Sequence, residues 1–292
     1  MAVLLGSGNE DNPLGGGEPT GWRPNMNAIV GEHDLVMVVF DSLRYDTAVA
    51  AWQAGETPNV ARLLGPMGWQ RRESPGTFTL AAHMAFFHGF LPTPPGRHRE
   101  PRLFAMAFDG ARTTDGTTCV FRDEEGANML DGLTSRGYHT LCVGGVSFFN
   151  GRNPLGRVLP SMFAEAVWQP AFAHTQRDST HAQVSWCVRR LAELGPQRRL
   201  FLYVNISATH VPHAMYLPGA SEDSVESQRA ALAYADGALA PLIEAVHKRR
   251  RGERSFWMLL ADHGDAYGDD GRWGHRHAHP RVTEVPYAHV LR

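Results

Sequence analysis

Cysteine is scarce in this chain. The chain also lacks a long hydrophobic run and a large net charge. Three cysteines (Cys119, Cys142 and Cys187) are too few and too scattered among 292 residues for a disulfide framework or a cysteine zinc cluster. No apolar stretch reaches the roughly 18 residues that could span a membrane, and the N-terminus lacks the basic and then apolar pattern of a signal peptide. A formal net charge of −2 argues against nucleic-acid and membrane-surface partners. Together these absences predict a cytoplasmic protein with reduced thiols.

Apolar residues and histidines, by contrast, are abundant. With 43% hydrophobic and 20% charged residues, the chain has the composition of a globular protein with a large core. There are fifteen histidines, and several stand beside Asp, Thr, Gly or Pro rather than within an apolar period. Only the positions of these histidines relative to the predicted strands and helices can indicate a function.

Two distant segments share one form, an apolar run of strand length that ends in an acid. Residues 35–40 lead into Asp41, and residues 256–261 lead into Asp262, His263, Gly264 and Asp265. Such continuous apolar runs predict strands buried on both faces of a sheet. In open α/β sheets ligands bind beyond the carboxyl ends of the strands. We therefore expect the two acidic ends to share one site.

Strands and helices alternate along the rest of the chain. Further strands are expected at 138–143, 200–206 and 285–291, and helices from about 58, at 126–136, and at about 180–194 and 224–248. This alternation predicts a three-layer α/β/α fold around a mostly parallel central sheet. We expect an irregular N-terminal arm at 1–32 and a single catalytic domain at 33–292. Loop insertions at about 93–130 and 146–175 are expected to wall the pocket.

The segment from Ser74 to Pro92 predicts a loop followed by a buried helix. The helix would begin near Thr79 and stop at Gly89. A hydroxyl at a helix N-terminus lies where backbone N–H groups and the helix dipole favour an anion. The simpler interpretation is that Thr79 only caps the helix.

Strand and helix ends thus offer Asp41, Thr79, His210 and the Asp262–His263 pair, with His275 close behind. Carboxylates, an imidazole and a hydroxyl form a reasonable shell for one divalent cation, and mixed oxygen and nitrogen ligation suits Zn²⁺ or Mn²⁺ better than Ca²⁺. A cation of this kind lowers the pKa of a bound hydroxyl and makes it a nucleophile.

At these residues the chain resembles the alkaline phosphatase superfamily, and specifically its sulfatase-like branch. The order and rough spacing of five motifs follow that family from about residue 34 onward: 41–46 (DSLRYD), 57–59 (TPN), 79–92, 209–213 (THVPH), and 262–265 (DHGD) through Gly274-His275 to Val285-Pro286. The resemblance implies a central mixed sheet flanked by helices. It also implies hydrolysis or transfer of a phosphoryl, phosphonyl or sulfuryl group.

Carried over position by position, the resemblance gives each residue a role. Asp41, Asp262 and His263 look like metal ligands, and Thr79 stands where the family has its metal-bound nucleophile. His210 resembles the histidine that contacts the substrate and protonates the leaving oxygen. His275 stands where related enzymes have a Lys or His against the same oxygens.

The chain also departs from the family pattern. Formylglycine-dependent sulfatases have Cys or Ser where this chain has Thr79, with Pro two residues on and Arg four residues on; here Ala81 and His83 stand at those places. Threonine cannot become formylglycine, which favours phosphorus over sulfate chemistry. The aspartate that two-metal enzymes carry four residues before the middle histidine is replaced by Ile206. One metal site is therefore expected, and a second would have to be improvised from histidines (His210, His213, His275, His277 and His279).

The sequence predicts a metal-dependent hydrolase or transferase that acts on a phosphate or phosphonate ester of a small metabolite. Three alternatives stay open: a sulfate or sulfamate ester hydrolase of the same fold, a two-metal phosphatase or phosphomutase, and a catalytically silent binding protein. Thr77 competes with Thr79 as nucleophile, and His83 either replaces the family's anion-binding arginine or simply points from its helix. Arg44 and Asp46 are expected to brace the first loop. The oligomeric state has no signature in the sequence.

Overall fold

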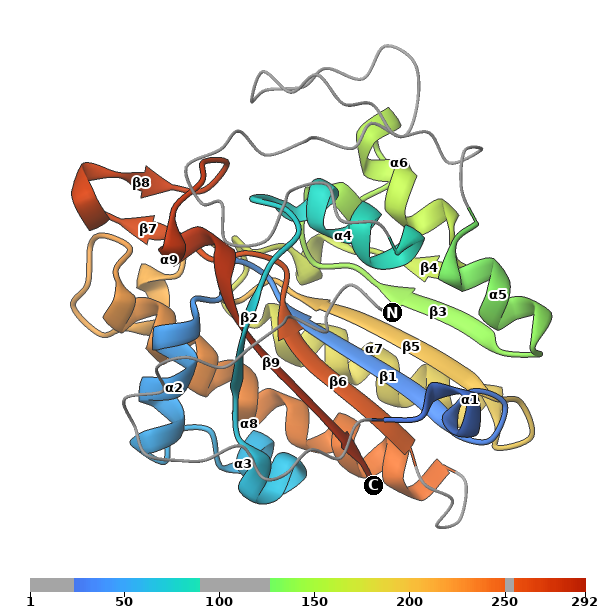
Figure 1. Cartoon of the computed structure of the whole chain (residues 1–292). Coiled ribbons are helices and arrows are strands. Elements are labelled where there is room, and N and C mark those ends of the chain that lie inside the picture. The colour runs from blue at the N-terminus through green and yellow to red at the C-terminus, as the bar shows by residue number, and fades with distance from the viewer. Residues whose placement is uncertain (1–23, 90–126, 250–254) are drawn as a thin grey trace.

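A computed structural model describes residues 24–89, 127–249 and 255–292 of the chain. Its centre is a seven-stranded sheet with the spatial order β2-β9-β6-β1-β5-β3-β4 (Figure 1). The strands are β1 (Asp34–Phe40), β2 (Gln70–Glu73), β3 (His139–Val143), β4 (Glu165–Val167), β5 (Leu200–Ile206), β6 (Ser255–Ala261) and β9 (Glu284–Leu291).

The five strands from β6 to β4 run parallel to one another, and β9 runs antiparallel to both β6 and β2. The prediction of a mostly parallel sheet is therefore confirmed. In the middle of the sheet β1 lies between β5 and β6, and Phe40 is level with both Ile206 and Ala261. The carboxyl ends of these three strands consequently meet at one edge.

Alternate residues of β1 supply two separate cores. Val36, Val38 and Phe40 belong to one apolar cluster, and Leu35, Met37 and Val39 belong to the other. The first cluster is covered by helices α2 (Tyr45–Gln53), α3 (Pro58–Leu64), α7 (Ser179–Leu194) and α8 (Val225–Arg249). The second is covered by α4 (Thr79–His88), α5 (Met129–Ser135) and α6 (Pro154–Ser161), with the short α1 (Met26–Ile29) at the rim. Because a strand in this position is buried on both faces, its sequence is apolar throughout, and the three-layer prediction is confirmed (Figure 1).

Most of the remaining differences from the predicted elements involve short pieces. Residues 146–175 were expected to be irregular, yet they contain α6 and the edge strand β4. The start of helix α6 is marked by an Asn-Pro pair. Asn153 is the N-cap and accepts a hydrogen bond from the Gly156 N–H, and Pro154 occupies the first turn. Residues 93–126 of the insertion expected at 93–130 lie outside the described residues.

A small ribbon projects beyond the carboxyl edge of the main sheet. It consists of β7 (Ala266–Tyr267) and β8 (Trp273–Gly274), paired antiparallel, and α9 (Pro280–Thr283) follows it (Figure 1). Within the three described stretches no helix has the length and apolar character needed to cross a membrane.

Candidate metal centre and active site

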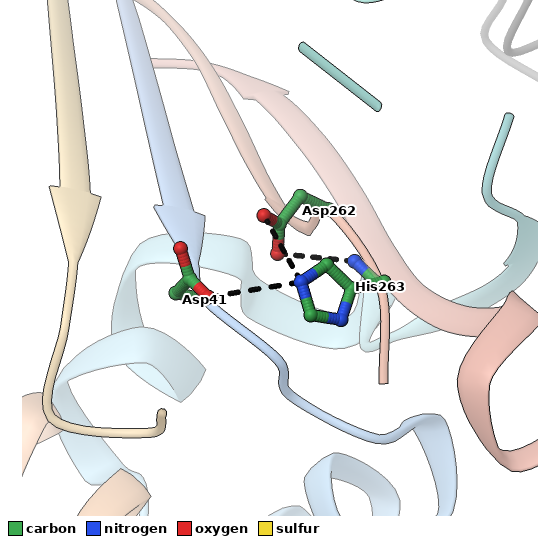
Figure 2. A group of neighbouring side chains, drawn as sticks. All are labelled: Asp41, Asp262 and His263. Carbon is green, nitrogen blue, oxygen red and sulfur yellow. Dashed lines mark hydrogen bonds and ion pairs between the residues drawn. The ribbon is translucent and has the colours of Figure 1, made fainter. Parts of the chain in front are cut away.

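Asp41, Asp262 and His263 meet at the carboxyl edge of the sheet (Figure 2). Asp41 follows β1 and the other two residues follow β6, the neighbouring parallel strand. One ligand atom from each lies within 4.8 Å of the other two, and all three side chains are fully buried. Parallel pairing thus brings together residues more than 220 positions apart in the sequence.

A tight turn after β1 fixes the two carboxylates. Ser42 has a φ of 62°, which is unusual for a residue other than glycine and concentrates at functional sites. In this conformation its N–H donates to Asp262 Oδ1 at 3.1 Å and its hydroxyl donates to Asp41 Oδ1 at 3.1 Å. The second oxygen of Asp41 accepts a hydrogen bond from Asn205 Nδ2 at 2.9 Å.

The orientation of His263 is fixed by the backbone. Its Nδ1 lies 2.9 Å from the Gly264 carbonyl, which can only accept, so the proton of the neutral ring is on Nδ1. Nε2 therefore presents a lone pair at 3.6 Å from Asp262 Oδ2 and 3.8 Å from Asp41 Oδ1 (Figure 2). Gly264 permits this turn because a Cβ there would come within 2.1 Å of the Arg281 carbonyl oxygen.

Burial and charge perturb all three groups. Burial alone would raise the pKa of Asp41, but the neighbouring His210 and His263 and the hydrogen bond from Asn205 hold it below its usual value. Burial and the adjacent Asp41 raise the pKa of Asp262 well above its usual value. Burial and His275 lower the pKa of His263 to about 3, which keeps the ring neutral and able to coordinate.

These residues fit a divalent cation. Asp262 Oδ2 and His263 Nε2 are buried and have no hydrogen-bond partner among residues 24–89, 127–249 and 255–292, although they lie 3.6 Å apart. Buried polar atoms are rarely left in this state, so the arrangement is complete only with a positive charge among them. Two carboxylates and one imidazole nitrogen suit Zn²⁺ or Mn²⁺ better than Ca²⁺. Their role as ligands stays a prediction.

Thr79 is the first residue of α4 and is buried beside this group. Its carbonyl accepts a hydrogen bond from His83 Nδ1 at 2.6 Å, and the same nitrogen lies 3.8 Å from Asp262 Oδ2. His83 therefore connects the start of α4 to Asp262, and the role of Thr79 as a nucleophile stays a prediction. Thr77 is also buried, and its carbonyl accepts a hydrogen bond from the N–H of Arg276.

His83 does not serve as a cationic anion binder. It is fully buried among aromatic rings, its Nε2 is hydrogen-bonded to the Tyr203 hydroxyl, and burial lowers its pKa to about 4. A neutral, enclosed imidazole cannot replace an arginine that contacts substrate. His83 therefore packs within the core at α4 and does not take the place of the anion-binding arginine.

His210 and His275 belong to a row of imidazoles that leads away from the metal centre. The ring centroids are 4.6 Å apart from His263 to His275, 5.8 Å from His275 to His210, and 4.8 Å from His210 to His174. His210 donates from Nδ1 to the Val211 carbonyl at 2.5 Å, which places its Nε2 as the other proton-carrying position. The catalytic roles of His210 and His275 stay predictions.

The other predicted histidines have structural partners. His213 is buried, with Nδ1 at 2.8 Å from Ser227 Oγ and Nε2 at 2.7 Å from the Tyr267 hydroxyl, and burial lowers its pKa to about 4. His279 caps α9 by accepting from the Arg281 N–H, and its ring lies 6.1 Å from that of His277. Neither arrangement supplies a second metal site by itself.

Arg44 and Asp46 brace the first loop, as expected. Arg44 is buried, donates to Asp46 Oδ1 at 2.8 Å and to Asp269 Oδ2 at 2.8 Å, and so ties the turn after β1 to the segment after β7. Burial would lower the pKa of Arg44, but these two acids raise it above its ordinary value.

Two residues near the site, Asn205 and His174, were not predicted from the sequence. Asn205 orients Asp41, and His174 ends the imidazole row. Asp265, which the sequence places in the motif after β6 without a role, lies 3.4 Å from His275 Nδ1. Asn205 had a detectable signal, since it is the polar residue inside the otherwise apolar strand 200–206. His174 had none, because it lies in an irregular segment that only the fold brings close.

Comparisons with known proteins agree with this arrangement. The family model described as Sulfatase matches residues 33–287. No curated protein sequence matches the chain. Among solved structures, the C-terminal periplasmic domain of the phosphoethanolamine transferase EptC from Campylobacter jejuni is 15% identical, with a TM-score of 0.60 over 89% of this chain and 79% of that one.

Two further structures resemble the chain to a similar degree. The soluble domain of lipooligosaccharide phosphoethanolamine transferase A from Neisseria meningitidis is 14% identical, with a TM-score of 0.60 over 89% of this chain and 76% of that one. The C-terminal periplasmic domain of EcEptC from Escherichia coli, in complex with Zn, is 13% identical, with a TM-score of 0.55 over 88% of this chain and 72% of that one. At such identities the likeness concerns the fold.

The match to the family model is stronger evidence, because it spans both strand ends that carry the buried acids as well as the segments of Thr79, His210 and His275. It supports the transfer or hydrolysis of a phosphate or sulfate ester. The chain belongs to the sulfatase family.

Proposed function

We propose that the protein is a metal-dependent hydrolase or transferase that acts on a phosphate or phosphonate ester of a small metabolite, with Thr79 as the nucleophile. The observation that carries the proposal is the buried group of Asp41, Asp262 and His263, in which two acceptor atoms have no hydrogen-bond partner among the described residues. His83 of α4 connects this group to the Thr79 carbonyl. A divalent cation held there would lower the pKa of a nearby hydroxyl and stabilise charge on the non-bridging oxygens of the ester.

In the proposed reaction Thr79 loses its hydroxyl proton to water before the ester binds, and its Oγ then forms a bond to phosphorus. The bond from phosphorus to the ester oxygen breaks, and His210, which enters this step doubly protonated, donates its Nε2 proton to that leaving oxygen. Water, or a second alcohol in a transferase, then displaces Thr79 from the phosphothreonine and gives its own proton to the neutral His210. The burial of Thr79 and of the two carboxylates supports this scheme, because charge–charge interactions are stronger where water is excluded.

Replacement of Thr79 tests the nucleophile. Thr79→Ala is expected to lower kcat/KM by on the order of 10³-fold or more, whereas Thr79→Ser keeps a hydroxyl and retains measurable turnover. Thr77→Ser and Thr77→Ala are the matched controls two residues away, and they should stay within about tenfold of the wild type. Mass spectrometry of the acid-quenched enzyme should find a phosphoryl group on the peptide that contains Thr79.

The same variants discriminate against the alternatives. If Thr79→Ala keeps full activity while Thr77→Ala loses it, the nucleophile assignment is wrong. Profiling with p-nitrophenyl phosphate, phenylphosphonate and sulfate esters distinguishes phosphorus from sulfate chemistry, and a preference for the sulfate would overturn the proposed substrate class. Elemental analysis should find one tightly bound Zn²⁺ or Mn²⁺ per chain; two would favour a two-metal phosphatase or phosphomutase.

A further inference from the structure

A second cavity adjoins the candidate active site on the side of the β7–β8 ribbon. It has a volume of about 570 Å³ and lies between the segment 211–223 and the ribbon. His275 and Asp265 line it, and the ring of His275 is 4.6 Å from that of His263. The cavity, called the side pocket below, therefore shares a wall with the metal centre.

Acidic side chains dominate the side pocket. Asp223, Glu222 and Asp265 line it, against one arginine, Arg276. The guanidinium of Arg276 lies 4.6 Å from the centre of the Phe78 ring, where it faces an aromatic partner next to α4. The lining thus carries an excess of acidic over basic side chains.

Asp265 is the most telling of these acids. It is one of the lining residues and is fully buried, and neither carboxylate oxygen has a hydrogen-bond partner within the described part of the chain. Its closest charged neighbour is His275, at 3.4 Å, which is too long for a good hydrogen bond. A buried carboxylate in this position calls for a positively charged ligand.

Asp223, another lining residue, is held in a fixed orientation. Its Oδ1 accepts hydrogen bonds from the N–H groups of His213 and Ala214, both at 2.7 Å. These bonds fix the carboxylate without neutralising its charge. A preorganised acid of this kind binds a cation at a lower entropic cost than a freely rotating one.

Trp273 stands at the rim with 67% of its surface exposed, the one large hydrophobic residue so exposed in the described ranges. It is held in place from below, since a Cβ at position 268 would lie 3.2 Å from its ring. An exposed indole face beside carboxylates is the arrangement that attracts an organic ammonium group.

A metal ion is a poorer match for the side pocket. The group of three acid or histidine ligands that converges within the described ranges is Asp41, Asp262 and His263, and neither Asp265 nor Asp223 joins such a group. Carboxylates spread around a cavity of this size, together with an indole, suit a bulky cation instead.

We infer that the side pocket binds an ammonium group carried by the ester whose phosphorus is attacked at the metal centre. The inference rests on the proposed function, and it names the substrate class: zwitterionic phosphate or phosphonate esters with a primary or quaternary amine. His275, which belongs to both sites, separates the reacting phosphorus from the ammonium group.

Two isosteric esters test the inference on the metal-loaded enzyme. p-Nitrophenyl phosphorylcholine carries a quaternary ammonium, and p-nitrophenyl 3,3-dimethylbutyl phosphate replaces that nitrogen by carbon. The cationic ester is expected to have a kcat/KM about 10-fold higher, the size of a combined ion-pair and cation–π contribution. Equal values for the two esters would overturn the inference while leaving the proposed function intact.

Three variants locate the effect. Asp223→Asn keeps the Oδ1 that accepts the two backbone N–H groups but removes the charge, and Trp273→Leu replaces a residue that the core does not need. Both should bring the two esters toward equal kcat/KM. Glu244→Gln also removes one negative charge, but on the exposed surface of α8, and it should keep the full 10-fold preference.

A binding measurement without turnover separates the two proposals. Calorimetric titration of the metal-free protein should show that choline binds more tightly than 3,3-dimethylbutanol, and that Asp223→Asn abolishes the difference. If neither ester is hydrolysed but choline still binds selectively, the proposed function fails and the side pocket is upheld. If choline binds no better than the neutral alcohol, the side-pocket inference is wrong whatever the enzyme hydrolyses.

Discussion

Strand β1 has a buried aspartate at each end, and the two carboxylates have very different surroundings. Asp34, at the amino end, faces Arg249 at 2.5 Å and accepts a hydrogen bond from the Leu200 N–H at 2.9 Å. Arg249 also donates to the carbonyls of Gly195 and Arg198. Asp41, at the carboxyl end, faces a second carboxylate and a neutral imidazole, with no cationic side chain paired to it in the described part of the chain.

The difference separates stability from function along a single strand. At the amino end the charge is neutralised within the protein, so this end stabilises the fold without any ligand. At the carboxyl end Asp262 and His263 keep buried atoms without partners, which costs stability and leaves affinity for a cation. The experiments below test that contrast.

Removal of the arginine at the amino end is expected to have the largest effect. Arg249→Met removes the buried ion-pair partner of Asp34, and it should lower the free energy of unfolding by about 3–5 kcal/mol, measured by denaturant titration. Lys248→Met is the matched control, because that neighbouring side chain is exposed in a surface pair with Glu244 and should change stability by less than about 1 kcal/mol. Equal losses in both variants would contradict the contrast between the two ends.

The carboxyl end should respond to pH through its buried histidines. The pKa of His213 is lowered to about 4, so the unfolded chain, with an ordinary histidine pKa near 6.5, binds the proton first as pH falls. The contribution of His213 to stability is therefore complete above about pH 6.5 and decreases toward pH 4, by about 2 kcal/mol between pH 7 and pH 5. Thermal unfolding of the metal-free protein measures this.

The variant His213→Gln isolates that contribution. Its absolute stability should be lower, since the contacts to Ser227 and Tyr267 are disturbed, but its dependence on pH should be flatter than in the wild type. An unchanged slope between pH 7 and pH 5 would assign the pH dependence to other groups.

The smallest effect on stability is expected at the metal centre, and its sign is opposite. Burial and Asp41 raise the pKa of Asp262, so this carboxyl destabilises the metal-free fold at neutral pH. Asp262→Asn keeps the acceptor for the N–H groups of Ser42 and His263 and should raise the free energy of unfolding by about 1 kcal/mol.

The same substitution should lower Zn²⁺ affinity by more than about 100-fold, beyond the loss typical of an outer-shell partner. Asp178→Asn serves as the control, because this residue is exposed at the start of α7 and its side chain forms no capping hydrogen bond. Tight Zn²⁺ binding by Asp262→Asn would remove this residue from the ligand set.

The sequence predicts the fold well where periodicity is strong. The strand at 200–206 has the expected bounds, and the apolar run at 256–261 is a strand that begins one residue earlier, at Ser255. Both are almost entirely apolar and are followed directly by polar residues. Short elements escape such reasoning: β2 has the sequence Gln-Arg-Arg-Glu and is a strand only because it pairs with β9. Tertiary pairing, not propensity, decides such segments.

The site divides in the same way. Asp41, Asp262 and His263 stand directly at strand ends, so adjacency of parallel strands is enough to bring them together. His174 could not be found from local pattern, since its importance depends on how loops fold back. Local sequence pattern also does not determine the cellular location, the metal or the substrate. The statements about these three stay predictions.

One backbone hydrogen bond has a consequence for how such enzymes diverge. The N–H of Arg276 donates to the carbonyl of Thr77 at 2.9 Å, and this bond moors the far end of the β7–β8 ribbon to the loop before Thr79. The segment between β7 and β8 can therefore change in sequence or length while this hydrogen bond keeps the loop before Thr79 in place. Preference for one alcohol or amine over another can change by replacing this short ribbon, without rebuilding the sheet edge that carries the buried acids.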